Sequence, residues 1–374
     1  LHGPYSNKTL MRNVLAMHIG NKVGGYHSRT RFVELIVNDS YEGIYVMMER
    51  IKRGPDRVDI ARLRTEDIAG DELTGGYIFK IDKDVPDWYS QYDMVFNAPI
   101  KVGFQHVYPR RAIIQPQQAD YIKSYVDSME NALFAPSLTY AGKSYLNFID
   151  LQSFAEHFLM KELAKAVDAY RISSDYFKRK NTNGGKVYAG PVWDFNLGYG
   201  NADYCEGWST TGWMYSLNCD RGNPFWWNRL RGIDEFNNLL SCRWEELKEG
   251  PLSVDSIFNF IDEKVAELEP ALERNFNRWP VLDVYVWPNT GGRNTFENEI
   301  RVLKDFYMQR VGWMSSQFSN SCIVNTEEEQ DNNTFFSTAF PNAMGMDDFQ
   351  LTFETQPNFK VEVTIFDAYV HLVF

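Results

Sequence analysis

The hydrophobic periodicity of the chain changes near residue 116, and this change constrains the fold more than any other feature. Before it, residues 30–51 alternate apolar and polar side chains on both sides of Asn38, which predicts a β-hairpin, and GGYIFKID (75–82) predicts a further strand. Apolar spacing typical of amphipathic helices predicts helices over residues 8–22, 117–133, 151–166, 234–248, 254–276 and 293–317. The sequence therefore predicts an α+β fold, with one helix and a small, mostly antiparallel sheet in residues 1–115 and a mainly helical part in residues 116–320.

Charge and hydropathy narrow the range of partners. The chain of 374 residues has a formal net charge of −12. Binding to nucleic acid or to an anionic lipid surface requires a basic footprint, so an acidic chain argues against both. No stretch of the sequence approaches the ~18 consecutive apolar residues of a membrane-spanning helix, which argues against a membrane span.

The C-terminal segment differs in character from the rest of the chain. Residues 321–334 contain the acidic, polar run NTEEEQDNN, which predicts a linker. Residues 335–374 alternate apolar and polar side chains with a period of two, which predicts a short all-β module. We expect this module to be a partial β-sandwich that is incomplete at its C-terminal end.

Two aspartates flank a predicted hairpin in the second part of the chain. Asp168 follows the helix predicted over residues 151–166, and Asn183-Gly184 marks the turn of a hairpin that ends just before Asp194, in GPVWDFNLGYG. A carboxylate at the end of a strand, followed by a glycine-containing turn, can hold Mg²⁺ against phosphate oxygens. Protein kinases have the same order of a catalytic aspartate, two short strands and an Asp-Phe metal loop. On this hypothesis Asp194 binds the metal, and Asp168 accepts or orients the proton of the acceptor hydroxyl.

The same two aspartates could instead cap turns or lie on the surface. Two features depart from a standard kinase. Ser173 occupies the position of the catalytic-loop asparagine, five residues after Asp168, and residues 1–115 lack a GxGxxG loop. The spacing alone therefore leaves both interpretations open.

A kinase also needs a cation on the phosphates, usually held by a carboxylate. The first part of the chain offers two candidate cations and one candidate carboxylate. Lys80 lies in the middle of a predicted strand, where a charge is unexpected unless it is used, and Glu49 lies in another strand. A Lys80–Glu49 pair that bridges two strands would fit this role, whereas two side chains on a solvated sheet face are the alternative. Arg12, near the start of the first helix, could reach a phosphate or could be an exposed helix residue.

Cysteines and tryptophans gather after Asp194. None of the four cysteines is in CxxC spacing, which argues against a zinc site. Cys205 and Cys219 flank a Trp- and Gly-rich stretch and could form a disulfide if the protein is exported, whereas buried free thiols are the alternative. We expect Trp226 and Trp227 to lie in the core, because NPFWWNRL resembles the start of an amphipathic helix.

Several of these segments together resemble the CotH kinase family, which is named for a bacterial spore-coat protein. The resemblance extends from about residue 1 to residue 317, and its motifs keep the family's order: LHGPYSNKTLMRN, RTRFVELIVNDSYEGIYVMMERI, TGGYIFKIDK, VDAYRISSDYFKRK and YAGPVWDFNLGYG. It implies a divergent, two-lobed protein-kinase-like fold over residues 1–320. It also implies an atypical kinase that transfers phosphate from ATP to serine with a divalent cation, Mg²⁺ or Mn²⁺.

Carried over to this sequence, the resemblance places the family's metal-binding aspartate at Asp194 and its catalytic aspartate at Asp168. Its strand lysine falls on Lys80, and the acidic residue of its YxGxYxxxE motif falls on Glu49. Many members have a second acid two residues after the metal aspartate. Here that position is Asn196, whose amide can still ligate Mg²⁺ but brings less charge.

The predicted β module resembles the C-terminal sorting domain of the type IX secretion system. It has FPNA where a YPNP-like opening is usual, and Val370 where a glycine is common. The resemblance implies export through the secretion machinery and attachment to a bacterial cell surface. Export in turn favours a disulfide between Cys205 and Cys219.

The leading hypothesis is an exported, ATP- and Mg²⁺-dependent protein kinase-like enzyme that phosphorylates Ser/Thr hydroxyls of a protein substrate. The rival hypothesis is a non-catalytic surface, adhesion or scaffold protein on a kinase-like fold. The scarcity of ATP outside cells and the presence of Ser173 favour this rival, whereas retention of both aspartates favours the enzyme. Carbohydrate binding through the Trp-rich stretch is a third hypothesis.

Overall fold

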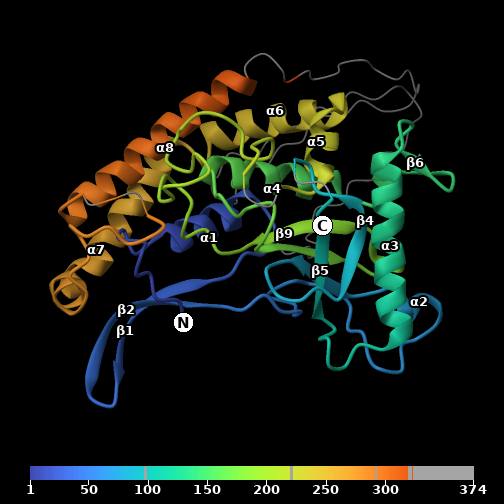
Figure 1. The fold of residues 1–374 in the computed structure, drawn as a ribbon, viewed down its shortest axis with the longest axis horizontal. Helices are drawn as coiled ribbons and strands as arrows, with labels where there is room; N and C mark the ends of the chain where they lie inside the picture. The colour runs from blue at the N-terminus through green and yellow to red at the C-terminus, as the bar shows by residue number, and fades with distance from the viewer. Residues whose placement is uncertain (97–98, 220–221, 290, 292, 319–321, 323–374) are drawn as a thin grey trace, which may run out of the picture. The chain divides into compact units, whose positions relative to one another are not determined.

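The computed structural model describes residues 1–96, 99–219, 222–289, 291, 293–318 and 322, and Leu1–Ile323 form one compact unit (Figure 1). The predicted linker, apart from Cys322, and the predicted β module lie outside the described residues. The predicted combination of helices and antiparallel strands is confirmed. The described α-helices are α1 (Arg12–Val23), α2 (Gly70–Leu73), α3 (Pro116–Phe134), α4 (Leu151–Ala164), α5 (Phe225–Arg231), α6 (Asp234–Glu249), α7 (Val254–Arg278) and α8 (Phe296–Phe318). The described strands are β1 (Thr30–Val37), β2 (Ser40–Met48), β3 (Tyr77–Ile81), β4 (Trp88–Asp93), β5 (Lys101–Tyr108), β6 (Thr139–Tyr140), β7 (Lys143–Ser144), β8 (Ser174–Lys178) and β9 (Val187–Val192).

A five-stranded antiparallel sheet in the order β4-β5-β3-β8-β9 forms the centre of the unit. Strand β3 is its middle strand, and in its register Lys80 lies opposite Gln105 of β5 and Asp175 of β8. The sheet therefore combines strands from before and after residue 116. The small sheet predicted within residues 1–115 is thus extended by the predicted hairpin of β8 and β9, because β3 pairs with β8, which is distant in the sequence.

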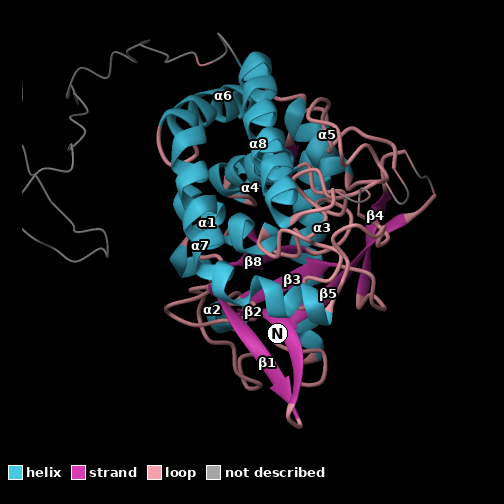
Figure 2. Ribbon diagram, turned by 90° about the vertical axis from the view of Figure 1, so that its left-hand side faces the viewer, coloured by secondary structure: helices cyan, strands magenta, loops and turns pink. Residues whose placement is uncertain are grey.

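The predicted hairpin of residues 30–51 is confirmed, but β1 and β2 form a separate two-stranded sheet. Asn38 and Asp39 both have positive φ, 48° and 63°, as a tight hairpin turn requires. The hairpin projects from the rest of the unit (Figure 2). Its backbone is tied to α7, because the amide of Ile44 donates a hydrogen bond to Asn275 Oδ1 at 2.8 Å.

Helix α4 lies between the central sheet and helices α6 and α8, and it packs against α1, α6, α8 and β9 (Figure 1). Its sequence LQSFAEHFLMKELA is apolar on most faces, and even its charged Lys161 and Glu162 are fully buried. Helix α1 starts later than predicted because Leu10 has φ 63°, which a right-handed helix does not allow. The elements that pack on α4 carry the segments from which the candidate site is built.

The core contains the tryptophans as predicted, since Trp226 and Trp227 are both 0% exposed. The disulfide between Cys205 and Cys219 is confirmed. A second disulfide, which the sequence did not indicate, joins Cys242 of α6 to Cys322 beyond α8. None of the described helices is long and apolar enough to span a membrane.

Candidate active site

Asp168 lies in the loop between α4 and β8, where the loop is fixed from the inside. The hydroxyl of Ser174, at the start of β8, donates a hydrogen bond to the carbonyl oxygen of Ala169 at 2.7 Å. The same hydroxyl accepts a hydrogen bond from Nζ of Lys161 at 2.8 Å. A buried side chain of α4 therefore holds the backbone that carries Asp168.

The carboxylate of Asp168 has two side-chain partners. Its Oδ1 accepts a hydrogen bond from Nη2 of Arg171 at 2.9 Å and a longer one from the hydroxyl of Tyr204 at 3.4 Å. The Arg171 side chain is only 4% exposed, and that of Asp168 is 16% exposed. One face of the carboxylate is thus occupied, and its orientation is set by neighbours from two loops.

Asp194 follows β9 and lies in a turn that is held by its backbone. The residue has φ 59°, a left-handed conformation that aspartate adopts more readily than most residues. The amide of Phe195 donates a hydrogen bond to Asn13 Oδ1 at 2.6 Å, and Nδ2 of Asn201 donates one to the carbonyl oxygen of Asn196 at 2.9 Å. Helix α1 therefore fixes the turn directly.

The side chain of Asp194 is half-buried and its carboxylate has no hydrogen-bond or ion-pair partner among the described residues. Burial raises the pKa of Asp194, and the nearby charges of Asp168 and Asp82 raise it further, while Lys83 partly opposes them. The structure thus brings the two predicted aspartates within each other's electric field. Like charges in a half-buried place repel each other, and a bound cation would relieve that repulsion.

Lys80 is the cation of β3, and its acidic neighbours are Asp82 and Asp175. Its Nζ forms an ion pair with Asp82 Oδ2 at 2.6 Å, and its side chain is 26% exposed. Asp175, which lies opposite on β8, is buried, and burial raises its pKa to about 7 despite the opposing charges of Lys80 and Lys161. Asp82, the ion-pair partner of Lys80, also raises the pKa of Asp194, and the cation that lowers the pKa of Asp194 is Lys83.

The predicted pairing of Lys80 with Glu49 is wrong. Glu49 follows β2 of the separate hairpin and forms ion pairs with Arg29 at 2.6 Å and Arg57 at 3.1 Å. The hydrogen bonds from Arg29 are the main reason that the pKa of Glu49 falls to about 2. Two arginines close in sequence to the hairpin thus bind the Glu49 carboxylate. Lys80 instead forms an ion pair with Asp82, which directly follows β3.

Arg12 is not an exposed helix residue, which was the alternative interpretation of its position. Its side chain is 0% exposed, and Nη1 donates hydrogen bonds to Asn7 Oδ1 at 2.8 Å and to Thr9 Oγ1 at 3.2 Å. Burial lowers the pKa of Arg12 to about 9. The neighbouring residue, Asn13, is the one that holds the turn of Asp194.

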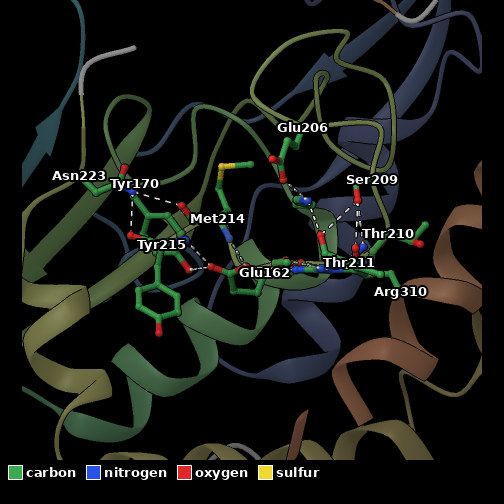
Figure 3. A network of polar contacts seen from close by, with 12 residues as sticks. Glu162, Tyr170, Glu206, Ser209, Thr210, Thr211, Met214, Tyr215, Asn223 and Arg310 are labelled. Carbon is green, nitrogen blue, oxygen red and sulfur yellow. Dashed lines mark hydrogen bonds and ion pairs between the residues drawn. The ribbon is translucent and has the colours of Figure 1, made fainter. Parts of the chain in front are cut away.

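A buried ion pair fixes the segment that follows the turn (Figure 3). Glu162 of α4 and Arg310 of α8 are both fully buried, and Oε2 of Glu162 lies 3.1 Å from Nη2 of Arg310. Glu162 accepts hydrogen bonds from the hydroxyl of Tyr170, in the loop of Asp168, and from the amides of Met214 and Tyr215. Arg310 also donates to backbone carbonyls of the segment, at Thr210 and Gly212. One ion pair therefore ties the loop of Asp168 and residues 210–215 to helices α4 and α8.

The oxygen atoms of this site suit a hard divalent cation such as Mg²⁺ or Mn²⁺. Asp194 offers a carboxylate without a partner, and Asn196, also half-buried, lies on the same turn. In the described ranges, no three His, Cys, Asp or Glu side chains are close enough to hold a metal by themselves.

Sequence reasoning missed several residues that complete this arrangement, among them Arg171 and Asn201. Asp82 and Asp175 lie near Lys80, Asn13 holds the turn of Asp194, and Lys161 and Tyr204 hold Asp168 and its loop. Two signals were available. Asp82 lies two positions from Lys80, and Lys161 is a charge in an otherwise apolar stretch of helix.

The comparison with protein families gives one match. The family described as CotH kinase protein matches residues 1–314. No curated protein matches the chain.

Proposed function

The chain belongs to the CotH kinase family, and from this premise we propose that it is an atypical protein kinase-like enzyme that transfers phosphate from ATP to Ser/Thr hydroxyls of a protein. The observation that supports the proposal is that the charge of Asp168, in the loop after α4, raises the pKa of Asp194, after β9, and that Asp82, the partner of Lys80, acts on the same carboxyl group. Phosphoryl transfer relies mainly on positioning and charge stabilisation, and Asp168, Asp194 and Lys80 supply both.

Asp168 is the proposed catalytic base. The reaction forms a bond between the acceptor oxygen and the γ-phosphorus and breaks the bond between that phosphorus and the β–γ bridging oxygen. The hydroxyl proton passes to the Asp168 carboxylate, which Arg171 and Tyr204 hold in one orientation. ADP leaves as the second product.

Asp194 is the proposed metal ligand, with the amide oxygen of Asn196 as a second ligand. A bound Mg²⁺ or Mn²⁺ would neutralise negative charge on the phosphate oxygens. The support for this assignment is that the Asp194 carboxylate has no other partner among the described residues, while the backbone of its turn is fixed by Asn13 and Asn201.

Lys80 is the proposed phosphate-binding cation, because it is partly exposed and its partner Asp82 also acts on Asp194. We propose that Asp82 and Asp175 take the place of the predicted partner and hold the lysine. Glu49, which is bound by two arginines, would act on a nucleotide only through Arg29 or Arg57. The predicted contact of Arg12 with a nucleotide phosphate stays a proposal.

The wider proposals concern architecture and location. We propose that residues 1–115 and 116–320 correspond to the two lobes of a kinase-like fold that share the central sheet. Two disulfides support an oxidising compartment, and hence secretion or a place on the cell surface. Export by type IX secretion through the C-terminal tail rests on the resemblance of residues 335–374 alone.

The rival function, a non-catalytic surface or scaffold protein, is favoured by two departures from the kinase pattern. Ser173 replaces the asparagine that follows the catalytic aspartate, and Asn196 replaces a second acid. Both changes remove metal ligands or lower their charge.

Transfer of labelled γ-phosphate from ATP distinguishes the two functions. With Mg²⁺ or Mn²⁺ present, we expect the full chain to label itself or serine-containing proteins. Asp168→Asn should lower the rate by about 10²–10⁴-fold, the usual contribution of a general base. Asp120→Asn, an exposed aspartate on α3, is the matched control. A folded wild-type protein that transfers no phosphate with either metal would favour the rival.

A further inference from the structure

Two buried cations at the start of α1 lack an anionic partner among the described residues. Lys8 and Arg12 are both 0% exposed. Nζ of Lys8 donates a hydrogen bond to the carbonyl oxygen of Val284 at 2.5 Å, and Nη1 of Arg12 donates to Asn7 and Thr9. These partners are neutral. Burial of an ion without an opposite charge is strongly unfavourable, so the arrangement is incomplete as it stands.

The free hydrogen-bond donors lie on the edge of Arg12 that recognises anions. Within the described ranges, Nε and Nη2 of Arg12 have no partner, and neither has Nδ2 of Asn7. The Nε–Nη2 edge of a guanidinium binds a carboxylate or a phosphate through two parallel hydrogen bonds. Asn7 is already in contact with Arg12 through its Oδ1, so its free amide belongs to the same place.

One buried carboxylate, that of Glu299, acts on both cations. Its Oε2 forms an ion pair with Arg293 at 2.8 Å, and its Oε1 has no hydrogen-bond partner within the described ranges. The charge of Glu299 raises the pKa of both Lys8 and Arg12, and that of Arg293 lowers it. A second carboxylate that acts on Lys8, that of Asp283, is exposed. Two buried cations thus share one buried carboxylate, which is already paired with Arg293.

We propose that Lys8, Arg12 and Asn7 form an internal binding site for a phosphate-type oxyanion. Arg12 holds the anion with its Nε–Nη2 edge, and Lys8 and the amide of Asn7 complete the site. Inorganic phosphate or sulfate and the phosphate group of a nucleotide share this chemistry. The site is separate from Lys80, which lies on β3 with Asp82 as its partner.

Occupation of this site would act on the turn of Asp194. Nδ2 of Asn201 donates hydrogen bonds to the carbonyl oxygen of Ser6 at 3.3 Å and to that of Asn196 at 2.9 Å. Asn13, adjacent to Arg12, accepts the hydrogen bond from the amide of Phe195. Residues 6–13 therefore contain the anion site and also hold the turn of Asp194. A bound anion stabilises this segment and, through it, the turn.

Thermal unfolding of the full chain tests the site. Phosphate, sulfate and metal-free ATP are each titrated in a chloride buffer of constant ionic strength. A ligand that binds only the folded state raises the Tm as its concentration exceeds its Kd, so we expect a saturable rise of several degrees. Arg12→Gln should abolish the rise, and Arg62→Gln, an exposed arginine, should leave it unchanged.

A second measurement tests the site even if Arg12→Gln does not fold, because it uses only wild-type protein. Wild-type protein is dialysed into chloride, denatured, and analysed for released phosphate and sulfate by ion chromatography, with about one anion per chain expected for a tight site. A rise in Tm with phosphate or sulfate identifies a free anion as the ligand. A rise with ATP alone that Arg12→Gln removes identifies a nucleotide phosphate at this site, because ATP bound near Lys80 would still raise the Tm of that variant. No saturable rise and no released oxyanion would overturn the proposal. Asp194→Asn, which the proposed function requires to be inactive, should keep the effect, so the two proposals fail independently.

Discussion

Hydrogen bonds hold both the loop of Asp168 and the turn of Asp194, but the carboxylates of these two residues differ in their partners. Asp168 is held by its side chain, through Arg171 and Tyr204, as well as by its loop. Asp194 is held only through the backbone of its turn, and its carboxylate has no partner in the described part of the chain.

The difference agrees with the proposed division of roles between a base, Asp168, and a metal ligand, Asp194. A side chain that must accept a proton in one direction benefits from neighbours that fix its orientation, as those of Asp168 do. A metal ligand must instead keep its oxygen atoms available, and the unfavourable burial of Asp194 becomes useful once a cation is bound. The contrast is therefore the expected signature of a base beside a metal ligand.

The largest expected effect comes from breaking the Glu162–Arg310 ion pair, which supports the loop of Asp168 and residues 210–215. Arg310→Met leaves Glu162 charged and buried without its partner, which should lower the free energy of unfolding by about 3–5 kcal/mol. Urea unfolding measures the loss. Arg301→Met, on the exposed side of the same helix, is the control and should change little. A loss below about 1 kcal/mol for Arg310→Met would contradict a shared support.

The next effect concerns the buried carboxyl group of Asp175, which lies opposite Lys80 on the neighbouring strand. The pKa of Asp175 rises from 3.8 to about 7 in the folded protein. The folded state therefore binds more protons than the unfolded chain between these values, and this carboxyl makes the wild type less stable as pH rises from about 4 to about 7. Asp175→Asn removes this loss, so its stability relative to wild type should improve by about 2–4 kcal/mol across the range.

Urea unfolding of both proteins at several pH values measures this difference. Asp120→Asn, an exposed aspartate on α3, is the control for the substitution itself. A difference between Asp175→Asn and wild type that stays constant from pH 4 to pH 7 would show that Asp175 is ionised normally.

The smallest effect compares the two candidate aspartates directly. Asp168→Asn loses a charged hydrogen bond with the buried Arg171 and should lower the free energy of unfolding at pH 7 by about 1–2 kcal/mol. Asp194→Asn removes a charge that burial already disfavours, so it should be neutral or stabilising by up to about 1 kcal/mol. The raised pKa of Asp194 also means that its destabilising contribution grows as pH rises above 3.8. Equal losses for both variants, measured by urea unfolding, would remove the contrast.

The sequence predicted the features that depend on local patterns. The hairpin between β8 and β9 follows from the Asn183-Gly184 turn, and it fixes Asp168 before the first strand and Asp194 after the second. The buried Trp226 and Trp227 follow from helical periodicity. Each of these predictions needed only residues that are close together in the chain.

The features that the sequence did not predict depend on long-range pairing. The pairing of β3 with β8 places Asp175 opposite Lys80, and no periodicity within either strand indicates it. Glu49 appeared to be a partner for Lys80 because both residues were expected in strands of one sheet. The structure separates their sheets, and Arg29 lies nearer to Glu49 than Lys80 does.

Calorimetric titration of ATP, with and without Mg²⁺ or Mn²⁺, tests the central claim that Asp194 is the metal ligand of a nucleotide site. We expect wild-type protein to bind the metal–ATP complex with a Kd of about 1 µM to 1 mM, the usual range for enzyme substrates. Asp168→Asn should bind with similar affinity, and Asp194→Asn should bind ATP equally weakly with and without metal. No binding by the wild type would contradict the nucleotide site, and metal-dependent binding that survives in Asp194→Asn would contradict the metal assignment.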